Sequence, residues 1–238
     1  MVKQMNVLIA CEESQRVCIE FRKLGHRAFS CDIMECSGGH PEWHIQGDVL
    51  ELLNPDVHAL HDCQYYGFHF QTMDGIKHRI RGRWDMIIAF PPCTYMTKAG
   101  ACRMFPHSGQ IDSDRFIKAM AAKEFFMAIY NADCEKIAIE NPTPLKVVGL
   151  PNSSQVIQPY QFGHPYSKRT LLWLKGLPPL ESTSVLGSYA PYVASNTSKF
   201  AKGGGGSLGV AKVALDRSKT FLGIAKAMAE QWGGQVDE

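Results

Sequence analysis

Five short apolar runs, separated by amphipathic segments, restrict the fold of this chain more than any other feature. They are NVLIAC (6–11), HRAFSCD (26–32), HIQGDV (44–49), WDMIIAF (84–90) and KIAIEN (136–141). Short apolar runs of this kind, bounded by Gly, Pro and acidic residues, are typical of buried strands. Strands that alternate with helices predict an α/β fold with a doubly wound, mostly parallel sheet and helices on both faces.

The segments between and after these runs have helical periodicity. Ser14 is expected to cap a first helix, a second helix is expected over about 112–132, and a third over FLGIAKAMAEQWGG near the C-terminus. The apolar faces predicted for them are Val17, Cys18, Phe21 and Leu24; Ile117, Met120, Ala121, Phe125 and Ala128; and Ile224, Ala225, Met228, Ala229 and Trp232. Segments 155–163 and 168–176 are expected to be later strands, close enough to form a hairpin.

The length and composition predict one domain, and the lack of a membrane span or signal-peptide pattern predicts a cytoplasmic location. With 238 residues, 45% of them hydrophobic, the chain can bury one substantial core, so residues 1–238 are expected to form a single domain. The formal charge of +2 permits a polyanionic partner without requiring one. No apolar run reaches the roughly 18 residues of a membrane span, and the first residues lack a signal-peptide cleavage pattern. We therefore expect no membrane partner.

The eight cysteines do not predict a disulfide framework. They lie at positions 11, 18, 31, 36, 63, 93, 102 and 134, and none forms a Cys-x-x-Cys pair. His61 with Cys63, or Cys36 with His40 and His44, are conceivable metal ligands, but their spacings fit no closed tetrahedral site. We expect no metal site, and we expect most of the thiols to lie in apolar surroundings.

Polar groups follow each predicted strand. They are Cys11-Glu12-Glu13-Ser14, Asp32, Asp48, Pro91-Pro92-Cys93 and Glu140-Asn141. A doubly wound sheet binds ligands at the carboxyl ends of its strands, so these groups suit a nucleoside-type cofactor and chemistry. Each also has a plainer interpretation, because an acid after a strand is often a helix cap or a turn residue.

Cys93 follows two prolines at the end of the most hydrophobic run. Two prolines fix two φ angles at roughly −65° and offer no N–H group, so they form a stiff support for a nucleophile. A rigid turn with a space-filling cysteine is an equally weighted alternative. Glu140, at the end of the next predicted strand, favours the first interpretation because it would bring a carboxylate beside the thiol.

At these residues the chain resembles the cytosine carbon-5 DNA methyltransferases. That family has a Pro-Pro-Cys nucleophile after its fourth strand and a Glu-Asn dipeptide after its fifth, and both occur here in that order. The acids at 32 and 48, the basic segment Ser167-Lys168-Arg169 and the C-terminal TFLGIAKAMAEQW match further motifs of the family. In the family the last of these is a helix that returns to the cofactor pocket. The match covers most of the chain.

The resemblance implies a Rossmann-like methyltransferase that uses S-adenosylmethionine and acts on DNA, with the target cytosine flipped out or single-stranded. The implied catalytic residues are Cys93, Glu140 and Arg169. The implied cofactor-binding residues are Cys11, Glu12, Ser14, Asp32 (at the ribose), Asp48 (at the adenine), Val49 and Pro91. The implied substrate-binding residues are Pro92, Thr94, Asn141 and Lys168.

The chain also departs from the family. Its first strand leads into ACEESQ rather than a glycine-rich segment, so Glu12, Ser14 and Gln15 would have to replace glycine backbone at the cofactor. Thr94 replaces the usual Gln, and the interval after Ser167 is too short for a full target-recognition domain. The chain therefore resembles short phage-encoded members, which act in a bacterial or phage-infected cell.

Two basic segments lie outside these motifs. Residues 61–83 mix Tyr65, Tyr66, Phe68 and Phe70 with Lys77, Arg79, Arg81 and Arg83. This insertion is expected to be either a hairpin against DNA or a small hairpin packed on the domain. Residues 186–217 are expected to form a flexible loop. Its GGGGS segment (203–207) is also the usual engineered linker, so a native and an introduced loop both fit.

The leading interpretation is methyl transfer to cytosine carbon 5 in DNA. One alternative keeps the chemistry but uses a free cytidine nucleotide as the substrate, which would require no target-recognition domain. Another is a non-catalytic DNA- or nucleotide-binding protein with this fold, of anti-defence or regulatory type, which the altered first motif favours.

Overall fold

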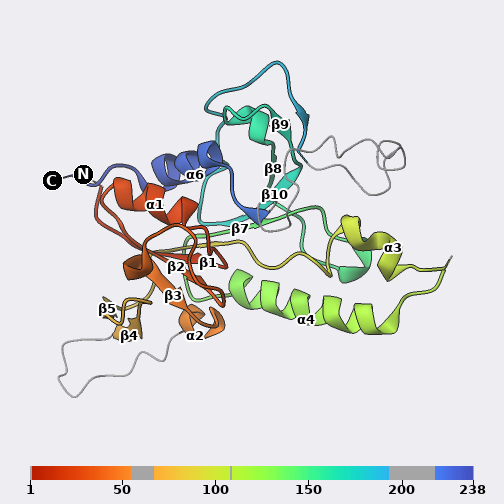
Figure 1. The fold of residues 1–238 in the computed structure, drawn as a ribbon, viewed down its shortest axis with the longest axis horizontal. Coiled ribbons are helices and arrows are strands. Elements are labelled where there is room, and N and C mark those ends of the chain that lie inside the picture. Colours follow the sequence, from red (N-terminus) through yellow and green to blue (C-terminus); the bar gives the residue numbers. More distant parts are fainter. Residues whose placement is uncertain (1, 55–66, 108, 193–217, 238) are drawn as a thin grey trace.

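A seven-stranded, mostly parallel sheet forms the centre of the protein (Figure 1). The computed structural model describes residues 2–54, 67–107, 109–192 and 218–237. The strand order is β3-β2-β1-β6-β7-β10-β8; β10 pairs antiparallel with both β7 and β8, and the other pairs are parallel. The strands are β1 (Asn6–Ala10), β2 (Arg27–Asp32), β3 (His44–Gln46), β6 (Met86–Ala89), β7 (Ile137–Asn141), β8 (Gln155–Ile157) and β10 (Thr170–Lys175). The predicted α/β class is confirmed.

All five predicted strand runs are strands, and the hairpin expected within 155–176 is present as the antiparallel pair β8–β10. The run 44–49 forms a shorter strand than predicted, because Asp48 accepts the N–H of Leu50 and starts a helix. Strand order reverses at β1 and β6: the chain goes outward through β2 and β3 and then returns to the other side of β1. Ligands bind near such a reversal in open α/β sheets.

The helices are α1 (Arg16–Lys23), α2 (Leu50–Leu53), α3 (Ala101–Met104), α4 (Ser113–Tyr130) and α6 (Leu222–Met228), which continues as a π-helical turn, η5 (Ala229–Gly233). Short 3-10 turns are η1 (Pro41–Trp43), η2 (Lys98–Gly100), η3 (Lys146–Val148) and η4 (Pro159–Gln161). Successive residues of β1 belong to two hydrophobic clusters. Leu8 and Ala10 cluster with residues of α2 and α4, whereas Val7 and Ile9 cluster with residues of α1 and α6.

Two helix predictions were wrong in detail. Ser14 does not cap α1: Gln15 occupies the N-cap position with φ 57°, and the Glu12 side chain accepts the first N–H groups instead. The face predicted for α4 is correct only in part: Met120, Phe125 and Ala128 pack partly buried against the core, whereas Ile117 is 65% exposed and Ala121 is exposed too. The buried residues of α4 are Ala119, Phe126 and Ile129. Apolar residues lie all around this helix, so its periodicity does not single out one face.

The C-terminal stripe is confirmed. Ile224, Ala225, Met228, Ala229 and Trp232 are all buried. They belong to the same cluster as Val17, Cys18 and Phe21 of α1, and α1 and α6 lie side by side (Figure 1).

Residues 67–81 form a hairpin of β4 (Gly67–Gln71) and β5 (Lys77–Arg81). Phe68 and Phe70 are buried, with their rings against Trp84, so for these two residues the packed hairpin is the correct alternative. Tyr65 and Tyr66 lie outside the described residues. A further small sheet pairs β9 (Tyr166–Ser167) with β11 (Ala190–Pro191). The rest of the predicted loop, 193–217, lies outside the described part of the chain.

The β4–β5 hairpin lies at the amino-terminal ends of the parallel strands. The Arg27 side chain, at the start of β2, donates to the Arg79 carbonyl, and the Met73 N–H donates to the carbonyl of His44, at the start of β3. The hairpin also leads directly into the start of β6. Figure 1 shows it at one end of the molecule, with α3, which follows Cys93, at the other.

Of the seven described cysteines, Cys18, Cys31 and Cys134 are buried, Cys11, Cys36 and Cys93 are half-buried, and Cys102 is exposed. Within the described ranges, no three or more His, Cys, Asp or Glu side chains are grouped to hold a metal ion. In the same ranges, no helix combines the length and apolarity needed to cross a membrane.

Candidate active site

Cys93 lies on a short turn at the carboxyl end of β6. Pro91 is buried, Cys93 is half-buried, and Pro92 and Thr94 are exposed. The Met96 N–H donates to the Cys93 carbonyl at 3.1 Å and closes the turn. The thiol is therefore held near the surface of a stiff loop rather than sealed in the core.

The Pro-Pro-Cys loop is joined to the segment that follows β7. These strands are neighbours, with Ala89 opposite Ile139, so Cys93 and Glu140 come from adjacent strand ends. Asn141 is 1% exposed, and its Nδ2 donates to the Pro91 carbonyl at 3.0 Å. Two backbone bonds continue the connection, from Leu145 N–H to the Met96 carbonyl (2.7 Å) and from Lys98 N–H to the Thr143 carbonyl (3.0 Å). The two motifs form one structural unit.

The antiparallel strand β10 brings the basic segment to the same place. In its register Leu172 lies opposite Glu140, so the residues just before β10 lie beside the end of β7. Lys168 and Arg169 occupy those positions, Lys168 half-buried and Arg169 exposed.

Cys93, Glu140 and Lys168 lie within electrostatic reach of one another. Burial raises the pKa of the Glu140 carboxyl, and the positive charge of Lys168 opposes this rise. Burial also raises the pKa of the Cys93 thiol; the Glu140 charge raises it further and Lys168 lowers it. The cation that acts on both groups is Lys168. The catalytic role suggested for Arg169 stays a prediction for an exposed side chain.

Glu140 opens onto a narrow pocket of about 10 Å³, room for about one water molecule. The residues that line it come from β7, from the start of β10 and from the C-terminal segment: Glu140, Lys168, Thr170, Ser218, Thr220, Phe221, Ile224 and Met228. The C-terminal helix thus returns to the Glu140 region. A pyrimidine would fit only if part of this lining moved.

Sequence reasoning missed three hydroxyl residues of this pocket, Thr170, Ser218 and Thr220. They meet only because β10 runs antiparallel and α6 returns to the sheet, and no local pattern indicates either arrangement. The one signal was the resemblance of TFLGIAKAMAEQW to a motif that returns to the cofactor pocket.

Three of the predicted cofactor residues lie together at the carboxyl ends of β1, β2 and β3. Burial raises the pKa of the Cys11 thiol, and the negative charges of Asp32 and Asp48 add to this rise. Each acid also has a turn role: Asp32 accepts the Met34 N–H and Asp48 accepts the Leu50 N–H, both at 3.0 Å. A carboxylate has acceptor capacity beyond one such bond, so both acids fit the hydroxyl and amino groups of an adenosine. Val49, beside Asp48, is buried.

The loop after β1 is filled by side chains. Glu12, Glu13, Ser14 and Gln15 are all buried. The Glu12 carboxylate accepts the N–H groups of Val17 (2.7 Å) and Cys18 (3.2 Å), and burial raises its pKa to about 8. A glycine-rich loop offers such N–H groups to a ligand, whereas here Glu12 occupies them. The predicted contact of Glu12 with a cofactor therefore competes with its role as the cap of α1.

Gln15 links this loop to the one after β2. Its amide donates to the His40 carbonyl (2.8 Å) and accepts the His40 N–H (3.0 Å). Gly38 lies so close that a Cβ there would be 2.6 Å from the Gln15 Cβ. Gln15 therefore ties the two loops to each other.

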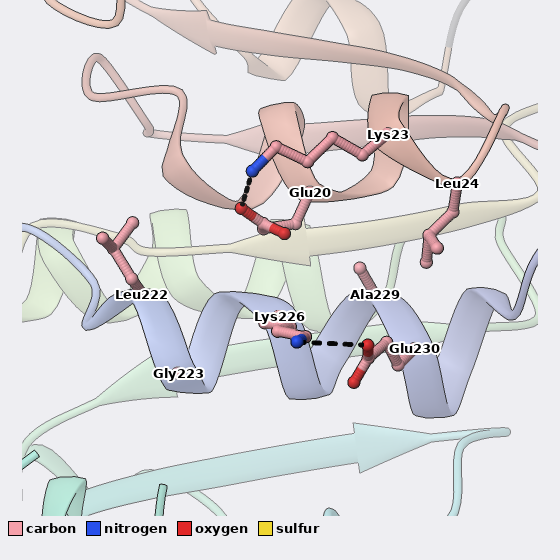
Figure 2. Close-up of a pocket in the computed structure, with 8 residues that line it drawn as sticks. All are labelled: Glu20, Lys23, Leu24, Leu222, Gly223, Lys226, Ala229 and Glu230. Atoms are coloured by element: carbon pink, nitrogen blue, oxygen red, sulfur yellow. Dashed lines mark hydrogen bonds and ion pairs between the residues drawn. The ribbon is translucent and has the colours of Figure 1, made fainter. Parts of the chain in front are cut away.

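A separate groove of about 420 Å³ lies between α1 and α6 (Figure 2). Ion pairs Lys23–Glu20 and Lys226–Glu230 lie along it, with Leu24 and Leu222 at its sides. None of its lining residues is a predicted site residue, and Ile224 and Met228 line the Glu140 pocket instead. The predicted site residues Glu140 and Lys168 therefore line the smaller pocket and not this groove.

Comparisons with known proteins add no family: no protein-family description matches the chain, and no curated protein does so either.

Proposed function

We propose that this protein is a DNA (cytosine-5-)-methyltransferase that uses S-adenosylmethionine and forms a covalent Cys93 adduct. The observation that carries the proposal is the joining of Pro91-Pro92-Cys93 to Glu140-Asn141, with Lys168 within reach of both reacting groups. The partition of β1 side chains between two helix-containing clusters supports the finer fold prediction, a Rossmann-like sheet with helices on both faces.

The residue types suit addition to a pyrimidine. Cytosine carbon 5 is a poor nucleophile until a thiolate adds to carbon 6, and a cysteine thiolate both adds readily and leaves again by elimination. Lys168 favours the thiolate through its charge. S-adenosylmethionine would supply the electrophilic methyl group for carbon 5. The carbon-5 proton must then leave before the Cys93 sulfur is eliminated.

Glu140 is suited to hold the opposite edge of the base. Its raised pKa means that the carboxyl takes up a proton more readily than an exposed one; when it binds that proton against a bound base, it can donate to N3 and stabilise the charge that builds there as sulfur adds. The three hydroxyls of Thr170, Ser218 and Thr220 offer further hydrogen-bonding groups in the same pocket.

Asp32 and Asp48 would hold the adenosine part of S-adenosylmethionine. The family resemblance adds Cys11, Val49 and Pro91 as further cofactor-binding residues. Ser14 is buried and Glu12 is engaged with α1, so the methionine end would rely on other groups of the loop. We place the reaction in the cytoplasm of a bacterial or phage-infected cell.

Transfer to DNA is our first choice, and transfer to a free cytidine nucleotide is the second. Duplex DNA must give up its cytosine, at a cost of a few kcal/mol that a free nucleotide avoids. The β4–β5 hairpin lies at the other end of the sheet, so within the described residues it adds no surface beside Glu140 for reading a long DNA site.

One experiment separates these functions from a binding protein. The chain is incubated with methyl-labelled S-adenosylmethionine and, in parallel, duplex DNA, single-stranded DNA and dCMP. Label in DNA is expected. Label in dCMP alone would mean that the substrate is the free nucleotide and not DNA. No label in any substrate, despite measurable binding of S-adenosylmethionine, would mean that the protein is a non-catalytic binding protein.

A second experiment tests the nucleophile. With S-adenosylmethionine present, DNA with 5-fluorocytosine should trap a covalent adduct with the wild type. Once carbon 5 has received the methyl group, its fluorine cannot leave as the carbon-5 proton does, so the Cys93 sulfur cannot be eliminated. Cys93→Ser should form none. An undiminished adduct in Cys93→Ser would show that a different thiol attacks.

A further inference from the structure

The wall of the Glu140 pocket that faces β7 and β10 comes from the segment leading into α6. Thr220 and Phe221 line the pocket together with Glu140 and Lys168, and Ile224 and Met228 of α6 line it too. Phe221 is buried and its ring packs on Tyr192 and His164. How closely a base could approach Glu140 therefore depends on what holds this segment in place.

Polar contacts to Arg16 and His164 help to hold it. The Arg16 Nη1 donates to the Thr220 carbonyl at 2.7 Å, across 204 positions of sequence. The Gly223 N–H donates to the His164 Nε2 at 2.9 Å. The approach is close: a Cβ on Gly223 would lie 2.0 Å from the Phe162 carbonyl oxygen, so the segment has little room to shift toward that side.

Arg16 directly follows the loop expected to meet the cofactor. It is the first residue of α1, directly after Gln15, and its charge acts on Glu12, which caps the same helix. Its charge acts on His164 as well, on the other side of the α6 segment. The acid comes from the β1–α1 loop. The imidazole lies between η4 and β9 and accepts the Gly223 N–H of the segment that forms the wall. The guanidinium joins the two.

We propose that Arg16 is a positioning residue, which holds the Thr220–Phe221 wall against Glu140 and thereby joins the cofactor loop to the base pocket. The inference rests on the proposed function. It adds to that function a residue that touches neither cytosine nor the reacting atoms. Removing the guanidinium should loosen the wall and weaken binding of the base while leaving the cofactor acids Asp32 and Asp48 in place.

The test uses Arg16→Met, which keeps the apolar stem of the side chain but has no donor. Arg16→Lys, which keeps a cationic donor, is the rescue variant, and Lys23→Ala, on the exposed side of the same helix, is the control. Three quantities are measured on each full-length variant: amide hydrogen exchange of residues 218–225, the KM for cytosine-containing DNA, and the Kd for S-adenosylmethionine.

For Arg16→Met we expect exchange in 218–225 and the KM for DNA each to rise roughly tenfold, as for loss of one charged hydrogen bond, with the Kd for S-adenosylmethionine unchanged within twofold. Arg16→Lys should recover part of both effects, and Lys23→Ala should match the wild type. Thermal unfolding checks that Arg16→Met is folded; if it is not, Arg16→Lys alone must show a smaller rise of both quantities.

Unchanged exchange in 218–225 would overturn the proposal, whatever the activity. Faster exchange with an unchanged KM would overturn it too, because the wall would not belong to the substrate pocket. A wild type that methylates no cytosine substrate would refute the proposed function, while the exchange measurement would still decide whether Arg16 holds the wall.

Discussion

The Nδ2 of Asn141 donates to the carbonyl oxygen of Pro91 at 3.0 Å, and this bond joins the two motifs from which the function is proposed. Because Asn141 is almost completely buried, it holds the backbone that carries Cys93 rather than presenting its amide to solvent. The substrate contact expected for Asn141 stays a prediction, but the structure gives it a contact with the nucleophile's own loop.

Loss of this bond should slow adduct formation. We expect Asn141→Leu and Asn141→Asp, neither of which can donate to Pro91, to reduce the rate of adduct formation with 5-fluorocytosine DNA by about 10- to 100-fold. A displaced nucleophile costs this much even when the shift is near 1 Å. The loss of a buried hydrogen bond should also lower the free energy of unfolding by about 1–3 kcal/mol. Rapid-quench trapping and thermal unfolding measure the two effects.

Asn131→Ala, at the exposed end of α4, is the control and should change neither quantity. Adduct formation at the wild-type rate in Asn141→Leu would mean that the Pro-Pro-Cys loop holds its shape without the bond.

The charges around Cys93 predict opposite effects of two substitutions on its thiol pKa. Glu140 raises this pKa and Lys168 lowers it, so Glu140→Gln should lower the pKa and Lys168→Gln should raise it. At a fixed pH below the pKa, alkylation of Cys93 by iodoacetamide should therefore be faster in Glu140→Gln and slower in Lys168→Gln. Mass spectrometry of the Cys93 peptide across pH 7–10 separates this thiol from the exposed Cys102.

Lys168→Arg keeps the positive charge and should resemble the wild type. If both Gln variants shifted the alkylation profile in the same direction, the arrangement of the three groups described here would be wrong.

The sequence predicted the sheet well, because each strand is an apolar run with its own boundaries and needs no distant partner to be recognised. It also predicted that the groups at 93 and 140 come from adjacent strand ends, since that follows from strand order alone. The β1–α1 loop could not be predicted in the same way. The choice of Glu12 over Ser14 as the cap depends on Cys11 and Gln15 taking positive φ angles, which these residue types rarely adopt.

Contacts between segments that are remote in the sequence could not be predicted, for a different reason. The bond from Arg16 to Thr220 joins a loop to the opposite end of the chain, and neither residue has a pattern that indicates the other. The basic hairpin shows the same limit. Its residues suggest a polyanion, but only the contacts of Arg27 and Met73 place it at the far edge of the sheet from Cys93.

That position predicts a small effect of the hairpin charges on chemistry. We expect Lys77→Glu with Arg81→Glu to leave kcat and KM on a short cytosine oligonucleotide within about twofold of the wild type. DNA engaged at the carboxyl ends of the strands does not reach the amino-terminal ends. Steady-state methyl transfer at two salt concentrations measures this.

Lys168→Glu is the comparison, since its charge lies at the catalytic edge and its loss should reduce activity strongly. A tenfold or larger loss of methyl-transfer activity in the Lys77→Glu, Arg81→Glu variant would mean that the hairpin is part of the DNA-binding surface.

Glu12 predicts a pH-dependent component of stability. Burial raises its pKa from 4.5 to about 8, so the folded state binds the Glu12 proton more tightly than the unfolded state does. Stability from this group is fully present below pH 4.5, falls as the pH rises, and is lost above about pH 8. In Glu12→Gln the group cannot titrate. The unfolding free energy of the wild type minus that of Glu12→Gln should therefore fall by a few kcal/mol between about pH 5 and pH 8.

Urea unfolding at a series of pH values measures this difference, in which the titration of groups that do not interact with Glu12 cancels. Glu12→Gln also loses one acceptor for the Cys18 N–H, but that cost does not depend on pH and moves the whole curve without changing its slope. Glu124→Gln, exposed on α4, should give no slope. A difference between wild type and Glu12→Gln that stayed flat or increased toward pH 8 would mean that the carboxylate form is the one the α1 amides hold, and that the buried loop after β1 tolerates a full negative charge.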